Sequence, residues 1–486
     1  MSGPNQTSPT PLPNPQLFIL LCIRFGEPIA FTLLFPFVYF MVRDFNITED
    51  EKLIGYYAGL ISASFAIGEF ISGVPWGMLS DRIGRKPVLM FGLFGTMTSM
   101  FLFGLSKSLP WAMTTRFMAG ILNGNVGVLK SMIGEMTDRS NRGKAFNYVS
   151  MVFGLGLIIG PALGGFLVYP VNNFPALFGN SSFFKEYPFA LPCFASSTLC
   201  GISMILGFFY LEETLSRASS AMDSTLSVTT PLLGSASNIN SSVKSLVATS
   251  ENQSFASESA STSTQVLPSQ NSTTRFSKGT WLVIQSYMGL SLIVTLSDEL
   301  FPFWAATHIS DGGLDYQASD IGLLNSMMGF VLVAMQLGLY NKLQRRFSAL
   351  TLFRWSFLLY SPLFLLMPMV KIFRDRNQPT LAWNVLVGMY VVRTFSNMLG
   401  FTSYNILLPE SCESKQDLGK INGVSQALSS LTRSFGPYLC GLFWSWSLSN
   451  GLSFPFDYHF TFFSIAVVSF IIFLIASRIL PEMVIH

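Results

Sequence analysis

The chain has 486 residues, of which 50% are hydrophobic, 14% aromatic and only 11% charged. So much apolar sequence over this length excludes a soluble globular protein and indicates that the bilayer is the solvent. The formal net charge is only +3, and the basic residues are scattered through short loops, so a nucleic-acid partner is excluded as well.

Apolar segments of roughly 17 to 25 residues, each long enough to cross a hydrocarbon core as a helix, follow one another along the chain. In the first half they cover approximately residues 17–42, 54–79, 87–105, 111–136, 145–168 and 189–211. In the second half they cover approximately 281–307, 321–343, 350–370, 381–408, 421–446 and 460–476. The sequence therefore predicts an all-α membrane protein with twelve transmembrane helices.

The two halves are separated by residues 212–279, which are rich in Ser and Thr and poor in aromatic residues. Such a segment buries too little apolar surface to offset its ordering entropy, so we expect a disordered linker. The expected organisation is a cytosolic N-terminal tail (1–16), a six-helix bundle (17–211), the cytosolic linker (212–279), a second six-helix bundle (280–478) and a cytosolic C-terminal tail (479–486). The tail has no basic region of a signal peptide, so the first apolar segment is predicted to remain as a helix.

The orientation follows from the positive charges of the short loops. With both termini in the cytosol, three cytosolic loops are basic, and they carry Arg82, Arg85, Lys86, Arg139, Arg142, Lys144, Lys342, Arg345 and Arg346. The predicted outer loops are mostly acidic or neutral, although residues 371–376 are basic against this pattern. The majority of the loops favours cytosolic termini and a cytosolic linker.

Three landmarks recur in the two halves in the same order. A Gly-Lys pair precedes a Gly-Pro pair by seventeen positions, at residues 143 and 160 and again at 419 and 436. Arg116 lies 27 residues before the first Gly-Lys pair, and Arg393 lies 26 residues before the second. This pattern is typical of two halves related by duplication.

The loop between the second and third apolar segments carries the most specific motif, GMLSDRIGRK at residues 77–86. It resembles the signature of the major facilitator superfamily. Glycines permit close helix approach and a tight turn, and an acidic residue beside basic ones can form charge-assisted bonds. We expect a conformational latch between the halves, formed by Gly77, Asp81, Arg82, Gly84, Arg85 and Lys86 and extended by Glu69. The alternative is a basic loop that only sets topology.

A second group of small residues crowds the fifth apolar segment. Its pattern resembles the antiporter motif of the same superfamily, at Gly156, Gly160, Pro161, Gly164 and Gly165. Helix packing alone is an alternative explanation. Stretches such as FPFVYFMVRDF (35–45) and LEETL (211–215) resemble the drug:proton antiporter branch with twelve spanners, and within it fungal members and plant zinc-induced facilitators. The chain lacks the plant Cys-Pro-Gly-Cys and the histidines of their linker, which speaks against zinc handling.

Acidic residues inside apolar segments are costly and normally face a cavity or a partner. Glu27 lies about 15 Å into the first segment at 1.5 Å per residue, near the midplane. It is a candidate proton carrier, and a static ion pair with Arg24 is the alternative. Asp298 and Glu299 are the other candidates for proton coupling, unless they lie in a solvated outer vestibule.

Three arginines are candidates for the substrate cavity. Arg433 lies near the midplane of the eleventh segment, just before a Gly-Pro pair, and its counterpart in the first half is Leu157. Arg393 and Arg116 occupy equivalent places in the two halves. A guanidinium keeps its charge and needs an acidic or carbonyl partner, so a permanent structural pair is the alternative in each case.

These observations and the resemblance predict the major facilitator fold and a secondary transporter. The expected function is proton-coupled antiport of a small organic molecule by alternating access. A facilitator or symporter is the alternative within transport, and a receptor that resembles a transporter is the alternative of another class. The expected partners are a small-molecule substrate, protons and lipid, acting on a monomer. No metal, cofactor or enzymatic activity is expected, and a vacuolar or other internal membrane is preferred to the plasma membrane.

Overall fold

The computed structural model describes residues 13–137, 141–215, 276–412 and 418–483. The helices considered below belong to one unit, which comprises Met1–Glu212 and Phe276–His486. The predicted linker and the predicted N-terminal tail lie largely outside the described residues, whereas residues 479–483 of the predicted C-terminal tail are described.

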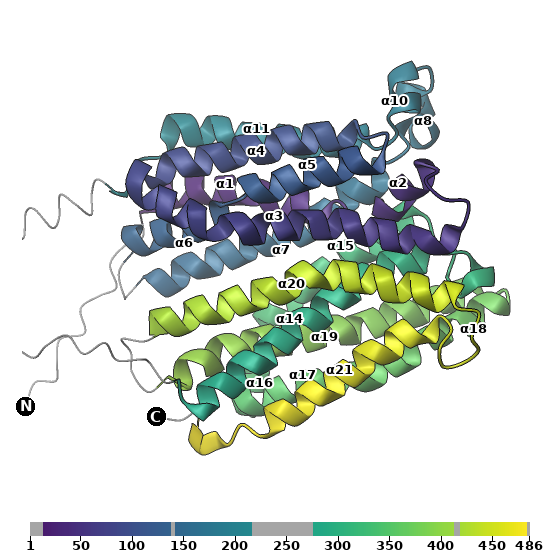
Figure 1. Cartoon of the computed structure of the whole chain (residues 1–486). Coiled ribbons are helices and arrows are strands. Elements are labelled where there is room, and N and C mark those ends of the chain that lie inside the picture. The colour runs from purple at the N-terminus through teal and green to yellow at the C-terminus, as the bar shows by residue number, and fades with distance from the viewer. Residues whose placement is uncertain (1–12, 138–140, 216–275, 413–417, 484–486) are drawn as a thin grey trace, which may run out of the picture. The chain divides into compact units, whose positions relative to one another are not determined.

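The first half is built of long helices that run along one axis (Figure 1). They are α1 (Asn14–Thr32), α2 (Val38–Asp44), α3 (Ile54–Ile83), α4 (Arg85–Gly104), α5 (Leu109–Leu122), α6 (Asn125–Met136), α7 (Arg142–Phe166) and α11 (Ala190–Tyr210). Short elements connect them: η1 (Glu51–Leu53), α8 (Pro170–Asn173), α9 (Pro175–Phe178) and α10 (Ser182–Glu186).

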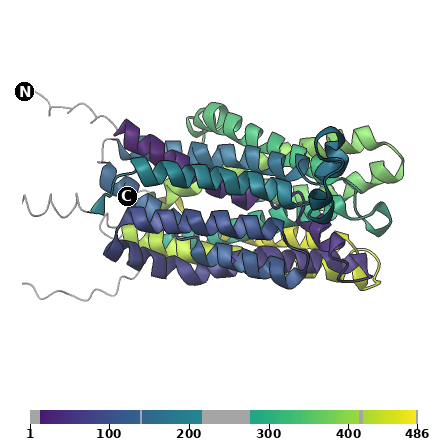
Figure 2. The same cartoon turned by 90° about the horizontal axis from the view of Figure 1, so that it is seen from above.

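The second half repeats this plan, and its helices run along the same axis (Figure 2). Its long helices are α14 (Lys278–Ala306), α15 (Ala318–Met335), α17 (Ala349–Leu366), α19 (Pro379–Glu410), α20 (Leu418–Ser449) and α21 (His459–Ser477). The shorter elements are η4 (Ile309–Asp311), the π-helical η5 (Gln336–Tyr340), α16 (Asn341–Gln344), η6 (Met367–Met369), α18 (Val370–Asp375) and η7 (Pro481–Met483).

Every predicted apolar segment is helical, which confirms the all-α fold class. Within the described residues, eight helical stretches are long and apolar enough to cross a membrane: 14–32, 51–73, 85–104, 190–210, 278–306, 318–344, 349–375 and 459–477. The remaining four predicted segments correspond to α5 with α6, α7, α19 and α20. α5 and α6 are each shorter than a full membrane span, and Met151–Phe166 of α7 forms a shorter apolar helix. α19 and α20 carry polar and charged residues, which are expected where a helix faces a polar interior.

Two predicted single helices are interrupted. The first segment breaks between α1 and α2, where Pro36 removes a backbone donor. The fourth breaks between α5 and α6 at Asn123 and Gly124, two residues that favour turns over helix interiors. The second break brings the side chain of Asn123 against Glu27 of α1, in the interior of the first half.

The two ends of the bundle differ. We call the end where α1 begins and α21 ends the terminal end, and the opposite end, with α8 to α10, the distal end (Figure 1). One apolar cluster contains residues of both halves and takes its α1–α3 members from the distal part, residues 30–61. At the terminal end, a separate cluster contains residues 17–23 and 128–133 of the first half only. The halves therefore share a core toward the distal end.

The α3–α20 contact shows the same asymmetry in one antiparallel register. A Cβ at Gly59 would lie 2.6 Å from the Pro437 carbonyl oxygen, and one at Gly441 would lie 2.5 Å from the Gly55 carbonyl oxygen, so only glycine fits there. Farther along, the Ser434 hydroxyl donates to the Ala66 carbonyl oxygen at 3.1 Å.

Beyond the Ser434–Ala66 bond the helices part. The same register would oppose Gly77 and Gly423, yet neither position has an atom within 4 Å of an added Cβ. Gly73, which lies between them and the last contact, is equally open. The structure is thus closed between α3 and α20 at the distal end and open at the terminal end.

Candidate substrate and proton-coupling site

Glu27 lies on α1 at the level of the break between α5 and α6. Its carboxylate pairs with the Arg24 guanidinium one turn earlier, and the Asn123 amide donates to its other oxygen at 3.3 Å. The Arg24 guanidinium also lies 5.7 Å from the ring centroid of Phe153 on α7. Glu27 is therefore held by an ion pair in this conformation, and its predicted role as a proton carrier stays a prediction.

A small cavity of about 10 Å³ lies beside this pair, lined by Glu27, Ala30, Phe31, Phe65, Thr96, Met100, Arg116, Ala119 and Asn123. That volume is on the order of the space for one water molecule. Two lining atoms, Asn123 Oδ1 and Arg116 Nε, are buried and have no hydrogen-bond partner among the described residues. Unpaired polar atoms thus lie at a small, mostly apolar cavity within the first half.

Glu69 lies on α3 and faces charges from both halves. It interacts electrostatically with Glu27 and Arg24 of α1 and with Arg433 of α20. We expected Glu69 to extend the latch around Asp81, but the structure places it in this central group of charges. Twelve residues of helix separate it from Asp81, which corresponds to about 18 Å.

Arg433 lies beside Glu69, with an exposed side chain. Its guanidinium donates to Ser430 Oγ at 3.0 Å, one turn earlier on α20. Lys130 of α6 is also exposed and interacts electrostatically with Arg24 and Arg433, both of its own sign. Arg24, Glu27, Glu69, Lys130 and Arg433 form what we call the central charge cluster.

The repeat-related arginines face neighbouring carboxylates on α14. Arg393 of α19 pairs with Asp298, donates to Ser297 Oγ and lies 5.0 Å from the ring centroid of Tyr390. This guanidinium is buried, so the pair matches the structural alternative for Arg393. Arg116 of α5 lies over the rings of Phe65 and Phe103, and its charge interacts with Glu299.

Glu299 is the exception among these carboxylates. Its side chain is 3% exposed, which contradicts a solvated vestibule in this conformation. It makes no ion pair with any residue in the described ranges, and it interacts with Ser62 of α3, in the other half. Neither Ser62 Oγ nor Glu299 Oε2 has a hydrogen-bond partner there. The carboxyl group is thus buried at the contact between the halves, and among the described residues its charge is met only by the longer-range interaction with Arg116.

The glycines of the antiporter-like motif make close contacts. A Cβ would lie 2.5 Å from Pro28 at Gly156, 2.0 Å from Thr32 Oγ1 at Gly160 and 2.0 Å from the Leu33 oxygen at Gly164. These positions pack α7 on α1, within the first half. Gly165 instead meets α15, where a Cβ would lie 2.6 Å from the Ala318 oxygen, and Pro161 lies inside α7 beside this contact. These residues therefore pack helices closely, and their predicted part in antiport stays a prediction.

The signature loop centres on Arg85. This side chain donates to Asp81 Oδ1 at 2.5 Å, to Ser80 Oγ at 2.6 Å and to Glu135 Oε1 at 2.9 Å. These bonds join α3, α4 and α6 of the first half. Gly84 has φ of 105°, which favours glycine, Arg82 is exposed, and Lys86 donates to the Phe208 carbonyl oxygen.

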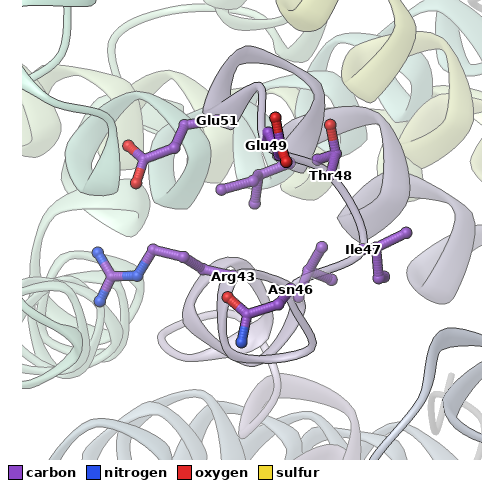
Figure 3. A pocket seen from close by; sticks show the side chains of 8 residues that line it. Arg43, Asn46, Ile47, Thr48, Glu49 and Glu51 are labelled. Atoms are coloured by element: carbon purple, nitrogen blue, oxygen red, sulfur yellow. The ribbon is translucent and has the colours of Figure 1, made fainter.

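A larger cavity of about 560 Å³ lies at the distal end and is lined by Val42, Arg43, Asn46, Ile47, Thr48, Glu49, Glu51 and Ile54 (Figure 3). It lies in the connection between α2 and α3, apart from the central charge cluster. Close to it, His308 lies 3.2 Å from carboxylate oxygens of both Glu51 and Asp315, linking the halves.

Four of these polar residues were not predicted from the sequence: Ser62, Asn123, Lys130 and Glu135. Lys130 and Glu135 are charged residues within a predicted membrane segment, so the cost of burying charge could have found them. The Asn-Gly pair at 123–124 is a recognisable helix interruption. Ser62 has no comparable signal, because serines are common in membrane helices.

Two helical halves with charged residues at their contact define a polytopic membrane transporter. A profile of the Major Facilitator Superfamily matches residues 20–437, and the chain belongs to this superfamily. That membership confirms the predicted fold and the prediction that the protein is not an enzyme.

Relatives and solved structures agree with this assignment. The chain is 33% identical to the major facilitator superfamily multidrug transporter mfsB of Aspergillus fumigatus, over 91% of this chain and 80% of the relative. It is 31% identical to ZINC INDUCED FACILITATOR-LIKE 1 of Arabidopsis thaliana, over 89% and 84%. The predicted resemblance to fungal and plant proteins is confirmed.

The solved structures extend the likeness to the fold. A bacterial homolog of the human lysosomal transporter Spinster, in an inward-facing and unoccupied conformation, has a TM-score of 0.68 at 13% identity, over 97% of this chain and 98% of that one. The crystal structure of a D-xylose-proton symporter has a TM-score of 0.65 at 14% identity, over 96% and 97%.

Proposed function

We propose that the protein is a proton-coupled antiporter of a small organic molecule that works by alternating access. The observation that carries the proposal is Glu299, buried at the contact between the halves with no ion pair among the described residues. An ionised carboxylate in such a place is costly, whereas the neutral acid is tolerated much better. Opening the contact would hydrate the carboxyl group and release its proton, so proton binding favours the closed contact.

The other intramembrane carboxylates support this choice by their contacts. Glu27 is paired with Arg24, and Asp298 is paired with Arg393. A carboxylate whose charge is compensated by a guanidinium suits a structural role. Relatives named as a multidrug transporter and as the efflux pump azaK of Aspergillus niger support export of an organic molecule.

The test is pH-driven transport by purified protein in liposomes, with a panel of organic solutes of both charges. Glu299→Gln should retain exchange of a transported solute between the two sides, because the neutral amide replaces the neutral acid. Accumulation driven by a pH gradient should be lost. Unchanged pH-driven accumulation in this variant would refute the role of Glu299.

Glu27→Gln is the matched variant, since it also removes one carboxylate but leaves Arg24 without its partner. It should reduce exchange itself, which distinguishes loss of a structural pair from loss of coupling. In the wild-type protein, solute movement indifferent to pH would indicate a facilitator, and movement along the proton gradient a symporter. Binding without movement would indicate a receptor.

The same proposal includes orientation. Basic residues at the terminal end, such as Arg82, Lys342, Arg345 and Arg346, support a cytosolic terminal end. The opening between α3 and α20 would then face the cytosol, the side from which an exporter or a vacuolar loader takes up its substrate.

A further inference from the structure

The central charge cluster lies where the contact between α3 and α20 ends. The last bond of that contact joins Ser434 and Ala66, and Arg433 and Glu69 lie beside it on the same two helices. From there toward the terminal end, Gly73, Gly77 and Gly423 have open space. The cluster is therefore accessible from the terminal end in this conformation.

The open face extends onto α6. Gly127 and Gly134 flank Lys130 on one side of this helix, and neither has an atom within 4 Å of an added Cβ. Lys130 interacts with Arg24 of the first half and Arg433 of the second. A side chain that interacts with charges of both halves lies on the face between them, so the open space beside it lies there too.

The charges of the cluster do not balance. Three cations, Arg24, Lys130 and Arg433, stand against two carboxylates, Glu27 and Glu69. Both carboxylates are already engaged, Glu27 by Arg24 and Asn123, and Glu69 by the charges of Arg433 and Arg24. The exposed donors of the cluster, the Lys130 ammonium and the Arg433 guanidinium, are left to face the opening.

Lys130 makes no ion pair with any residue in the described ranges, and its charged neighbours are cations. Like charges on three helices repel one another. An anion between Lys130 and Arg433 would offset this repulsion and accept hydrogen bonds from both side chains.

We propose that Lys130, with Arg433 and Arg24, forms a binding site for a small organic anion, such as an aromatic carboxylate, at the inner end of the opening between α3 and α20. The inference rests on the proposed function and names the class of its substrate. The anion binds from the terminal end, and its negative group lies between α6 and α20. A cationic molecule of the same size is disfavoured by the surplus positive charge.

The test uses two xanthene dyes of similar size and opposite charge, fluorescein and rhodamine 123, and measures their binding to the purified protein by fluorescence anisotropy. Binding does not require proton coupling, so this result is independent of the antiport assay. The wild-type protein should bind fluorescein in preference to rhodamine 123. Added salt should weaken the binding of fluorescein.

Lys130→Gln should weaken fluorescein binding about tenfold or more, the range for loss of one charge-assisted hydrogen bond. Lys130→Arg should restore most of the binding, and Lys130→Glu should shift the preference toward rhodamine 123. The matched control is Lys342→Gln, which removes an exposed lysine at the terminal end but outside the cluster.

Four outcomes would overturn the proposal. They are preference for rhodamine 123, equal binding of the two dyes, binding of neither dye at millimolar concentration, and an equal loss in Lys130→Gln and Lys342→Gln. Loss of pH-driven accumulation with anion binding intact would count against proton coupling instead, so the two proposals fail separately.

Discussion

Replacing Gly59 by Ala should shift the protein away from the conformation described here. The added Cβ would lie 2.6 Å from the Pro437 carbonyl oxygen and 3.2 Å from the Cα of Gly441. Both are backbone atoms that cannot move aside alone, so α3 and α20 must separate at the distal end. Overpacking of this kind costs about 1–3 kcal/mol. A cost borne only by this conformation would change its population ratio about 5- to 150-fold.

The measurement is the distance between spin labels at Met78 of α3 and Asn422 of α20, both exposed near the terminal end. Cys22 and Cys412, which are partly exposed, are replaced by Ser so that only the introduced cysteines react. Electron spin resonance then gives the distribution of distances. Gly59→Ala should increase the short-distance population, in which the terminal end is closed.

Gly73→Ala is the matched control, because it lies on the same helix and gains the same helix propensity, but its Cβ meets open space. It should leave the long-distance population unchanged or increase it. If both variants shift the distribution in the same direction, or if Gly59→Ala leaves it at the wild-type proportion, the contact at the distal end does not set the conformation and the reasoning is refuted.

Two further predictions concern the buried ion pair and the orientation. Asp298→Asn leaves the buried Arg393 without its counter-ion and should lower the free energy of unfolding by about 3–5 kcal/mol, seen as a lower melting temperature in detergent. Glu299→Gln breaks no ion pair and should melt near the wild type. Equal melting temperatures of the two variants would contradict the structural role of the pair. Protease added to the outside of intact cells or sealed organelles should spare residues 212–279, and cleavage there from that side would reverse the proposed orientation.

The sequence predicted the helices well because membrane segments carry a strong signal, namely long apolar stretches separated by short polar turns. It did not predict where those helices break. The turn at Asn123 and Gly124 lies inside a continuous apolar stretch, so length and apolarity alone read α5 and α6 as one helix. The break matters for the site, since it places Asn123 against Glu27.

The roles of the charged residues were harder to predict. From the sequence, Glu69 was expected to extend the latch of the signature loop, and Glu27 was a candidate proton carrier because of its depth in the first segment. Which acid is paired depends on contacts between helices far apart in the chain, such as Asp298 with Arg393, and no local pattern encodes them. The repeat did indicate that Arg116 and Arg393 are equivalent. In the structure Arg393 pairs with Asp298 and the charge of Arg116 interacts with Glu299, the next residue on α14.

The constant register of α3 against α20 has a consequence for the energy of switching. The bond between Ala66 and Ser434 lies eleven residues from Gly55 at one side and eleven from Gly77 at the other, which is about 16 Å of helix in each direction. If the halves rock about this point, the stretches of α3 on its two sides, residues 55–66 and 66–77, are equally long, and both contain glycines that face α20. Rocking would exchange one set of close backbone contacts for another of the same kind, without sliding the helices. Two conformations related in this way lie close in free energy, so binding one small ligand or one proton is enough to change which of them dominates.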